Sequence, residues 1–290
     1  MIRLIATCEP ARLPMLPQFV RNYARQGVDD FILSLQLEPS ADHGTASRAR
    51  AQADDIARKL DIRPLLDLRV PFDAMALRAH HDALQSSECS MQDWIVWADV
   101  DEFHWFGAHL REICADCDSQ GHDAVRGQFV DRVARAGELP PFDPERSIWS
   151  QFPIGCDVTS SIVEGMSKKV VLARAHVRMR HANHDPLRHQ RVNWSSIRAP
   201  VFHFKWDASV LRRLRARLEP DWKERCAWWT QSAAAISAID ASDGRIPIER
   251  LHCFDFHDDD YPTEYFPYET NRRYREQWIH WQTAFPHPSE

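Results

Sequence analysis

The sequence contains no long hydrophobic run. Its first ten residues, MIRLIATCEP, form an apolar stretch that is too short for a signal peptide and is interrupted at Glu9 and Pro10. No later segment approaches the roughly 20 apolar residues that a helix needs to span a bilayer. We therefore expect a cytoplasmic protein, and peripheral contact with a membrane stays open.

The chain also lacks an excess of positive charge and a disulfide framework. Its formal net charge is −6, so composition gives no general reason to bind nucleic acid. The seven cysteines are odd in number and scattered, which is typical of reduced thiols. Cys114 and Cys117 form a C-x-x-C motif, but no second pair completes a zinc site. We interpret them as two thiols on one helix face.

Internal repeats, low-complexity segments and Gly/Ser linkers are absent too, so the 290 residues predict one continuous domain. In the first hundred residues, apolar runs of strand length alternate with amphipathic segments. The expected strands are 3–7, 30–37, 61–68 and 94–98, and the expected helices are 16–27, 45–60 and 73–85. This β-α-β-α-β-α-β order predicts a mostly parallel sheet with helices on both faces.

The pattern changes after Phe103. We expect strands at 124–134, 168–179 and 199–206, followed by helices at 207–219 and 220–236. The stretch 211–219 is cationic and amphipathic, and an ordinary surface helix is the favoured reading over a membrane-binding one. Trp222, Trp228 and Trp229 could stack on sugars, but tryptophans at helical spacing are more often core, which we favour for Trp228 or Trp229. Asp258–Asp260 reads as a solvated turn.

The segment DWIVWADVDEFHWF, residues 93–106, places carboxylates where the fourth strand should end. In open α/β sheets, ligands lie beyond the carboxyl ends of the strands. Asp99 and Asp101 can point the same way, and two converging carboxylates repel unless a cation lies between them or one is protonated. Oxygen ligands suit Mg²⁺ or Mn²⁺. The segment therefore predicts a divalent-metal site, with a solvated acidic turn as the alternative.

This segment and several others in the chain together resemble the family 2-like glycosyltransferases of the GT-A fold, in the branch that contains a DxDEF motif. The resemblance rests on the strings GVDDFILSL, DWIVWADVDEF, GQFVDRVARAGEL, SKKVVLARAHVRMRHANH and HFKW, and it covers roughly residues 1–215. Cys8 stands where the family has Asn, and Gln36–Glu38 replaces a segment that is often an Asp-Asn pair. These departures concern the nucleotide contacts more than the metal.

The resemblance implies a GT-A type α/β fold with a Rossmann-like sheet and a helical C-terminal segment. Residues 1–103 would form the nucleotide-binding half and 104–215 the acceptor half, with 216–290 as a helical or irregular extension packed on the same domain. The implied activity is sugar transfer from a nucleotide-diphosphate donor to a glycan or other surface-polysaccharide acceptor. It would depend on Mn²⁺ or Mg²⁺ and proceed with inversion.

The resemblance also implies roles for individual residues. His203 would join Asp99 and Asp101 as metal ligands, with His184 as the rival candidate. A histidine packed among aromatics is an equal alternative for His203. Asp131 would be the catalytic base, with an ion pair to Arg132 as an equal alternative and Asp185 as second choice. Glu102 would anchor the loop. The remaining expected residues line the nucleotide pocket: Thr7, Cys8, Glu9, Arg12, Arg78, His81 and Asp99.

Two other functions remain compatible with the same carboxylates. One is a metal-dependent phosphoryl-transfer enzyme or phosphodiester hydrolase. The other is a carbohydrate-binding protein that keeps the fold without catalysis. The haloacid dehalogenase phosphatases also use D-x-D, but on the first strand, where this chain reads ATCEP.

Overall fold

The computed structural model describes residues 1–220 and 228–256. Trp222 and the expected turn at Asp258–Asp260 lie outside the described residues. None of the helices in the described ranges is long and apolar enough to cross a membrane.

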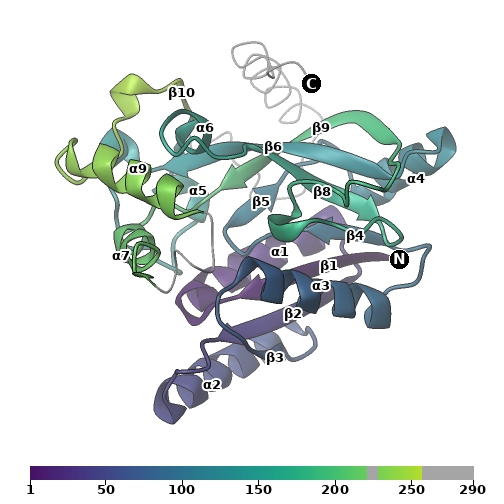
Figure 1. The fold of residues 1–290 in the computed structure, drawn as a ribbon. Helices are drawn as coiled ribbons and strands as arrows, with labels where there is room; N and C mark the ends of the chain where they lie inside the picture. Colours follow the sequence, from purple (N-terminus) through teal and green to yellow (C-terminus); the bar gives the residue numbers. More distant parts are fainter. Residues whose placement is uncertain (221–227, 257–290) are drawn as a thin grey trace.

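The N-terminal half is a parallel sheet with the strand order β3-β2-β1-β4 (Figure 1). Its strands are β1 (Ile2–Cys8), β2 (Asp30–Leu37), β3 (Leu66–Arg69) and β4 (Trp94–Trp97). The connecting helices are η1 (Pro10–Met15), α1 (Leu16–Gln26), α2 (His43–Leu60) and α3 (Ala74–Glu88). This half matches the alternation that the sequence predicts.

Local side-chain chemistry explains where these helices begin and end. α1 ends at Gly27, whose φ of 99° lies in the left-handed region that favours glycine. The carboxylate of Asp42 accepts a hydrogen bond from the amide of Thr45, so α2 begins two residues earlier than expected. Asp73 caps α3 in the same way, through the amides of Met75 and Ala76.

The second half extends the sheet in mixed directions. β8 (Lys168–Arg174) runs antiparallel to β4, and β6 (Ala124–Val133) runs antiparallel to β8. The other strands are β5 (Glu102–His104), β7 (Ile154–Cys156), β9 (Trp194–His203) and β10 (Cys253–Asp255). The other helices are α4 (Leu110–Gln120), η2 (Arg135–Gly137), α5 (Ile148–Gln151), α6 (Val158–Ser161), η3 (His181–Asn183), α7 (Val210–Ala216), α9 (Trp229–Asp240) and η4 (Ile248–Arg250).

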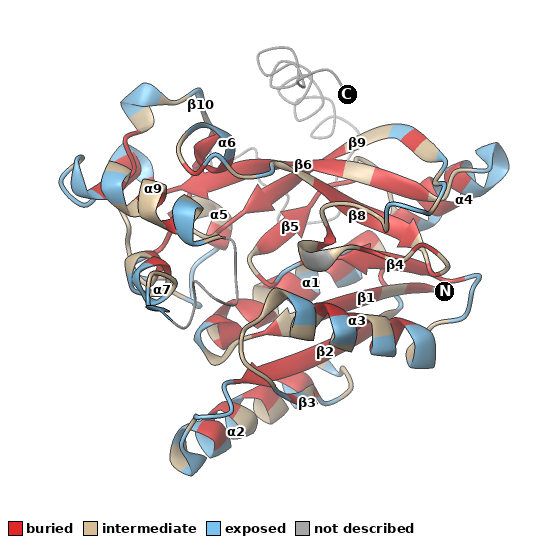
Figure 2. Cartoon of the chain, viewed as in Figure 1, coloured by how far each residue is buried: buried red, intermediate tan, exposed pale blue. Residues whose placement is uncertain are grey.

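Apolar layers cover both faces of the sheet, which is buried along most of its length (Figure 2). On one face Leu4 and Ala6 of β1 join the core that contains Phe19 of α1. On the other face Ile5 packs in the cluster that contains Leu84 of α3. The alternation follows from the two-residue period of a strand. The expected α/β class, with a Rossmann-like sheet between helices, is confirmed.

Several boundaries differ from the expected ones. β3 begins at Leu66 rather than 61, and the preceding Pro64 lacks the N–H that a ladder needs. β8 ends at Arg174, and α9 begins at Trp229, with 221–227 outside the described residues. The sequence did not predict β5, β7 and β10, because strands this short hold too few residues to show the two-residue alternation of apolar and polar side chains. Cys114 and Cys117 do share the buried face of α4.

The described part of the C-terminal region packs on the same sheet. Ile239 of α9 and Ile246 belong to an apolar cluster that also contains Val133 of β6. α7 contributes Leu214 to that cluster. These contacts hold α7 beside the carboxyl end of β9, from which its side chains reach the pocket described below.

Candidate functional site

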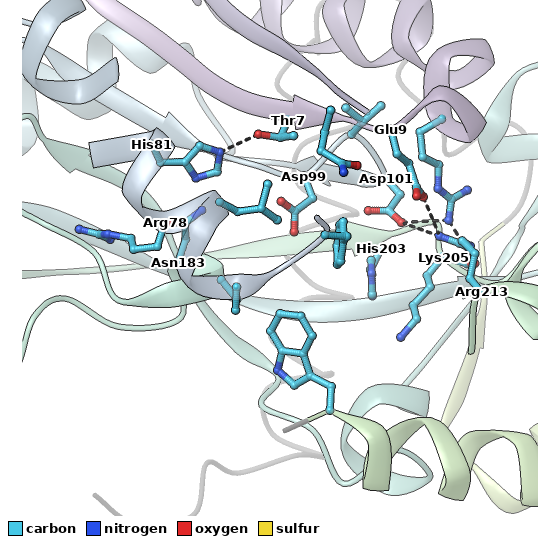
Figure 3. A pocket seen from close by; sticks show the side chains of 18 of the residues that line it. Thr7, Glu9, Arg78, His81, Asp99, Asp101, Asn183, His203, Lys205 and Arg213 are labelled. Carbon is cyan, nitrogen blue, oxygen red and sulfur yellow. Dashed lines mark hydrogen bonds and ion pairs between the residues drawn. The ribbon is translucent and has the colours of Figure 1, made fainter. Parts of the chain in front are cut away.

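A pocket of about 200 Å³ opens beyond the carboxyl ends of β1 and β4. Figure 3 shows the labelled side chains converging on it from both halves of the chain. The lining residues are Thr7, Glu9, Arg12, Gln36, Phe72, Ala74, Leu77, Arg78, His81, Asp99, Val100, Asp101, Ala182, Asn183, His203, Lys205, Arg213, Arg217 and Trp228. The position agrees with the rule for open α/β sheets.

A tight turn after β4 presents the two aspartates. The amide of Glu102 donates to the carbonyl of Asp99 at 2.8 Å, and the amide of Asp99 donates to the Glu102 carboxylate at 3.0 Å. Glu102 therefore anchors the loop, as expected. Tyr23 fixes the following strand, because its hydroxyl donates to the carbonyl of Glu102 and accepts from the amide of His104.

A buried lysine lies beneath this turn. The ammonium of Lys169 donates to Glu102 at 2.5 Å and to Asp99 at 3.2 Å. Burial alone would raise the pKa of Glu102, but Lys169 outweighs it and holds that pKa well below its usual range. Burial raises the pKa of Asp99 to about 6, with Lys169 opposing and Glu102 adding to the rise. The side chain of Asp99 is nevertheless 53% exposed, so its carboxylate faces the pocket.

Asp101 lies on the opposite side of the turn, against arginines. Arg12 is buried and donates to Asp101 at 3.0 Å and to Asp207 at 2.5 Å. Burial would raise the pKa of Asp101, but Arg12 keeps it below its ordinary value. Arg213 lies 3.9 Å from Asp101 and donates to the carbonyl of Lys205 at 2.7 Å.

Lys205 completes a cationic wall of the pocket. Its ammonium lies 5.0 Å from the centre of the Trp206 ring. Burial lowers the pKa of Lys205 to about 7, and the positive charges of Arg217 and Arg213 contribute to the fall. The pocket thus has acidic groups at Asp99 and Glu9 and a cluster of cations formed by Lys205, Arg213 and Arg217.

His203 reaches the pocket from β9, where it lies in register with Glu102 of β5. Its Nδ1 is 3.0 Å from the carboxylate of Asp131, and its ring stacks on Phe129 at 4.7 Å between centroids. His203 therefore packs on an aromatic ring and also lines the pocket, so the two expectations for it do not exclude each other.

Asp131 does not line the pocket. It is fully buried, and its carboxylate also accepts hydrogen bonds from the amide and hydroxyl of Thr159 and from the indole of Trp206. These hydrogen bonds, rather than the expected ion pair with Arg132, hold the Asp131 carboxylate in place. Because Asp131 is buried, is hydrogen-bonded by these groups and lines neither described cavity, the geometry gives no support to the expected role as base. It instead orients His203.

The first strand contributes only its alternate residues. Thr7 and Glu9 line the pocket, but Cys8 is 1% exposed and packs in the core on the other face of the sheet. Cys8, which we expected in the nucleotide pocket, is therefore not among the residues that line it. The Thr7 hydroxyl lies 2.9 Å from Nε2 of His81. Burial lowers the pKa of His81 to about 3, so its imidazole is neutral at pH 7.

Arg78 lines the pocket as expected, but its guanidinium is already paired. It forms an ion pair with Asp82 of the same helix and donates to the carbonyl of Arg180 at 3.2 Å. This second bond attaches α3 to the segment 179–186. In that segment Ala182 and Asn183 both have positive φ, 59° and 54°. Strained backbone of this kind clusters at functional sites.

A smaller cavity of about 110 Å³ adjoins this segment. It is lined by Met166, Arg180, His184, Asp185, Trp228 and Gln231. Trp228 belongs to both cavities, and it is only half-buried. Trp229 is 38% exposed. The favoured core position thus applies to neither residue.

The donor set fits a divalent cation in part. Asp99, Asp101 and His203 line one pocket, and His203 presents its Nδ1 to a carboxylate, as metal-binding histidines usually do. In the described residues, however, no three His, Cys, Asp or Glu side chains are grouped closely enough to hold an ion. Mg²⁺ is commonly held by one or two carboxylates plus substrate phosphates. Asp101 would have to exchange Arg12 for the cation.

Sequence reasoning did not assign several lining residues to the pocket. It noted Gln36 only as part of a departure from the family pattern, although Gln36 lies at the carboxyl end of β2, next to the pocket strand β1. Arg213 lies in the stretch that we expected to be an ordinary surface helix, and nothing in the sequence separates it from its neighbouring arginines. Asn183 is buried at the strained turn, which periodicity cannot detect.

No family model and no curated protein matches the chain. Among solved structures, residues 1–349 of S. aureus TarS align with 96% of this chain and 78% of that chain, at 10% identity and a TM-score of 0.35. TarS in complex with UDP-GlcNAc covers 82% and 72%, at 10% identity and a TM-score of 0.38. HddC from Yersinia pseudotuberculosis covers 73% and 97%, at 12% identity and a TM-score of 0.39. These values carry no functional assignment.

Proposed function

We propose that the protein is a glycosyltransferase that moves a sugar from a nucleotide-diphosphate donor to a glycan or other surface-polysaccharide acceptor. One observation carries the proposal. At the carboxyl ends of β1 and β4, the half-exposed carboxylate of Asp99 and the cations Lys205 and Arg213 line the same pocket. This pairing of charges suits a diphosphate that arrives with a divalent cation.

Breaking the bond between an anomeric carbon and a diphosphate leaves negative charge on phosphate oxygens. Lys205 and Arg213 are placed to offset that charge inside a pocket where water is partly excluded, which strengthens each interaction. A bound Mn²⁺ or Mg²⁺ would supply Lewis-acid stabilisation of the same oxygens. Asp99, Asp101 and His203 would hold the ion, and they would have to move together around it, because they are not grouped closely enough in this structure. Arg12 keeps the carboxylate of Asp101 ionised, and the cation would take the place of Arg12 on that carboxylate.

The remaining walls suit the other parts of the two substrates. Thr7, Gln36 and neutral His81 offer hydrogen-bonding groups to a nucleoside. The adjoining cavity offers Trp228 as an apolar face together with the carboxylate of Asp185, a combination suited to a sugar hydroxyl and its proton. We therefore assign the acceptor to that cavity, with Asp185 in place of Asp131 as the base.

A thermal-shift screen of nucleotide sugars tests the proposal. Each donor is added with Mn²⁺ or with EDTA, and Tm is compared with that of the free protein. A ligand at 100 times its Kd stabilises the folded form by about 2.7 kcal/mol, which predicts a rise of roughly 5 °C for a chain of this size. The rise should require Mn²⁺.

The same samples separate the alternatives. A nucleotide sugar that raises Tm and then releases its nucleotide when acceptor glycan is added supports transfer. Hydrolysis of simple phosphodiesters without any nucleotide-sugar shift would replace the proposal with a hydrolase. Glycan binding that persists in Asp101→Ala, again without a nucleotide-sugar shift, would replace it with a carbohydrate-binding protein.

A further inference from the structure

Two cysteines that do not line the pocket face each other near the edge of the sheet. Cys156 is the last residue of β7 and Cys253 is the first of β10, and the antiparallel register places them directly opposite. Both are reduced in this structure. The pairing joins segments that are distant in the sequence, so it depends entirely on the fold.

The hydrogen-bond pattern shows which kind of pair they form. The amide of Phe256 donates to the carbonyl of Pro153 at 3.0 Å, and these residues lie opposite each other in the same register. Because bonded and non-bonded pairs alternate along an antiparallel ladder, the pair three positions away is non-hydrogen-bonded. Such pairs have Cα atoms about 4.5 Å apart. That separation lies within the range that a disulfide spans.

The surroundings of the two thiols differ in a way that favours stepwise oxidation. Cys253 is exposed, whereas Cys156 is fully buried with its Sγ 3.7 Å from the carbonyl of Asp131. The Cys156 thiol donates to the carbonyl of Asp131, and the Cys253 thiol donates to the carbonyl of Ile248 at 3.4 Å. Burial raises the pKa of Cys156. Cys253 is thus the thiol that a dissolved oxidant can reach first, and its thiolate is the nucleophile.

We propose that Cys156 and Cys253 are a thiol–disulfide modification site that small-molecule disulfides oxidise to a cross-strand bridge. The Cys253 thiolate attacks one sulfur of the oxidant, forming a mixed disulfide and releasing one thiol. Cys156 then loses its proton and attacks Sγ of Cys253, which closes the bridge and releases the second thiol. The protein is oxidised by two electrons, and one oxidant disulfide is reduced to two thiols.

The bridge would tie β10 to the sheet next to the strand that holds Asp131. Cys156 pairs in register with Asp131 on its other side, and Asp131 positions His203. Among the other described cysteines, Cys8, Cys114 and Cys117 are buried in the core, and Cys89 is half-buried with no cysteine opposite it. Cys226 lies outside the described residues, so the test includes it as a control.

Oxidised glutathione, followed by mass spectrometry under non-reducing conditions, tests the site. The wild-type protein should lose two hydrogen atoms, yield a Cys156–Cys253 cross-linked peptide and gain several degrees in Tm, since a bridge across a long loop restricts the unfolded chain. Dithiothreitol should reverse all three changes. Cys253→Ser, at an exposed position, should abolish the bridge without impairing folding. Cys226→Ser should leave it unchanged.

The variant Cys156→Ala provides a second test. It should stop the reaction at the first step, leaving one glutathione on Cys253. A wild-type protein that accumulates this same mixed disulfide and never forms the Cys156–Cys253 peptide would overturn the proposal. So would a bridge that persists in Cys253→Ser. Neither outcome depends on nucleotide-sugar binding, so the result stands apart from the proposed function.

Discussion

The carboxylate of Asp131 lies 3.0 Å from Nδ1 of His203, and both residues are buried between β6 and β9. This contact fixes the ring of His203 and leaves Nε2 as the nitrogen available to the pocket. Thr159 and Trp206 donate three further hydrogen bonds to the two oxygens of Asp131. The geometry therefore fits His203 as a metal ligand that Asp131 orients better than it fits Asp131 as a catalytic base.

Asp131→Asn should destabilise the fold by about 3 kcal/mol, because an amide nitrogen replaces an acceptor that buried donors require. Hydrogen bonding to His203 and Trp206 lowers the folded-state pKa of Asp131 despite burial. The wild-type advantage should therefore be present above about pH 4 and disappear as pH falls through that lowered pKa. Urea unfolding at several pH values measures it.

Asp116→Asn, on the exposed face of α4, is the matched control for this substitution. It should change stability by less than about 0.5 kcal/mol. If Asp131→Asn left stability unchanged and abolished only turnover, Asp131 would be the catalytic base after all.

Binding of a nucleotide sugar with Mn²⁺ should strengthen as pH rises through about 6. Asp99 has its pKa raised to about 6 by burial, and a protonated carboxyl cannot hold a cation. A nucleotide sugar is the appropriate ligand because its esterified diphosphate does not titrate in this range. Calorimetry between about pH 5 and 6.5, below the pKa of about 7 at which Lys205 loses its charge, measures the step. Asp99→Asn should bind weakly at every pH, and a flat wild-type profile would count against Asp99.

Lys205→Met should weaken nucleoside-diphosphate binding about tenfold and stabilise the free protein at pH 6. Burial lowers the folded-state pKa of Lys205 to about 7, so the ammonium costs stability in the fold. That cost develops as pH falls below the unfolded pKa of about 10.4 and is complete below about 7. Thermal unfolding of both proteins at pH 6 and pH 11 tests this, because the variant should be the more stable protein at pH 6 and lose that advantage at pH 11.

Lys59→Met is the control, because Lys59 is 72% exposed on α2. It should affect neither binding nor the difference in stability between pH 6 and pH 11. Destabilisation of Lys205→Met at pH 6 would mean that Lys205 serves packing rather than anion binding.

Ala182→Gly should stabilise the protein by about 1 kcal/mol, because alanine at a φ of 59° pays a steric cost that glycine avoids. Ala51→Gly, at an exposed position inside α2, makes the same chemical change and should cost about 1 kcal/mol. Urea unfolding compares them. Equal losses from both variants would show that the turn at Ala182 is unstrained in solution.

The N-terminal half could be predicted from sequence because its signals are local. Apolar runs and amphipathic segments set the β-α alternation, and the alternation places the ends of β1 and β4 at one edge. The two-residue period could also have separated Thr7 and Glu9 from Cys8, which packs on the other face.

The rest of the site depends on contacts between distant segments. Lys169 meets Asp99 because β8 pairs with β4, and Arg12 meets Asp207 only after the chain returns past β9. The sequence indicates only the neighbouring Arg132 as a partner for Asp131, and the hydrogen bonds from Thr159 and Trp206 exist only in the folded chain. Hydrophobic periodicity and short motifs do not predict contacts between such distant residues.

Calorimetric titration of UDP, GDP, ADP, CDP and dTDP tests the central claim most directly. Wild type, Asp99→Asn and the control Asp116→Asn are each titrated with Mn²⁺ and with EDTA. We expect one nucleotide to bind wild type and Asp116→Asn in Mn²⁺, with affinity at least tenfold lower in EDTA or in Asp99→Asn. Failure of all five nucleotides to bind the wild-type protein, with or without Mn²⁺, would contradict the claim that this pocket holds a nucleoside diphosphate.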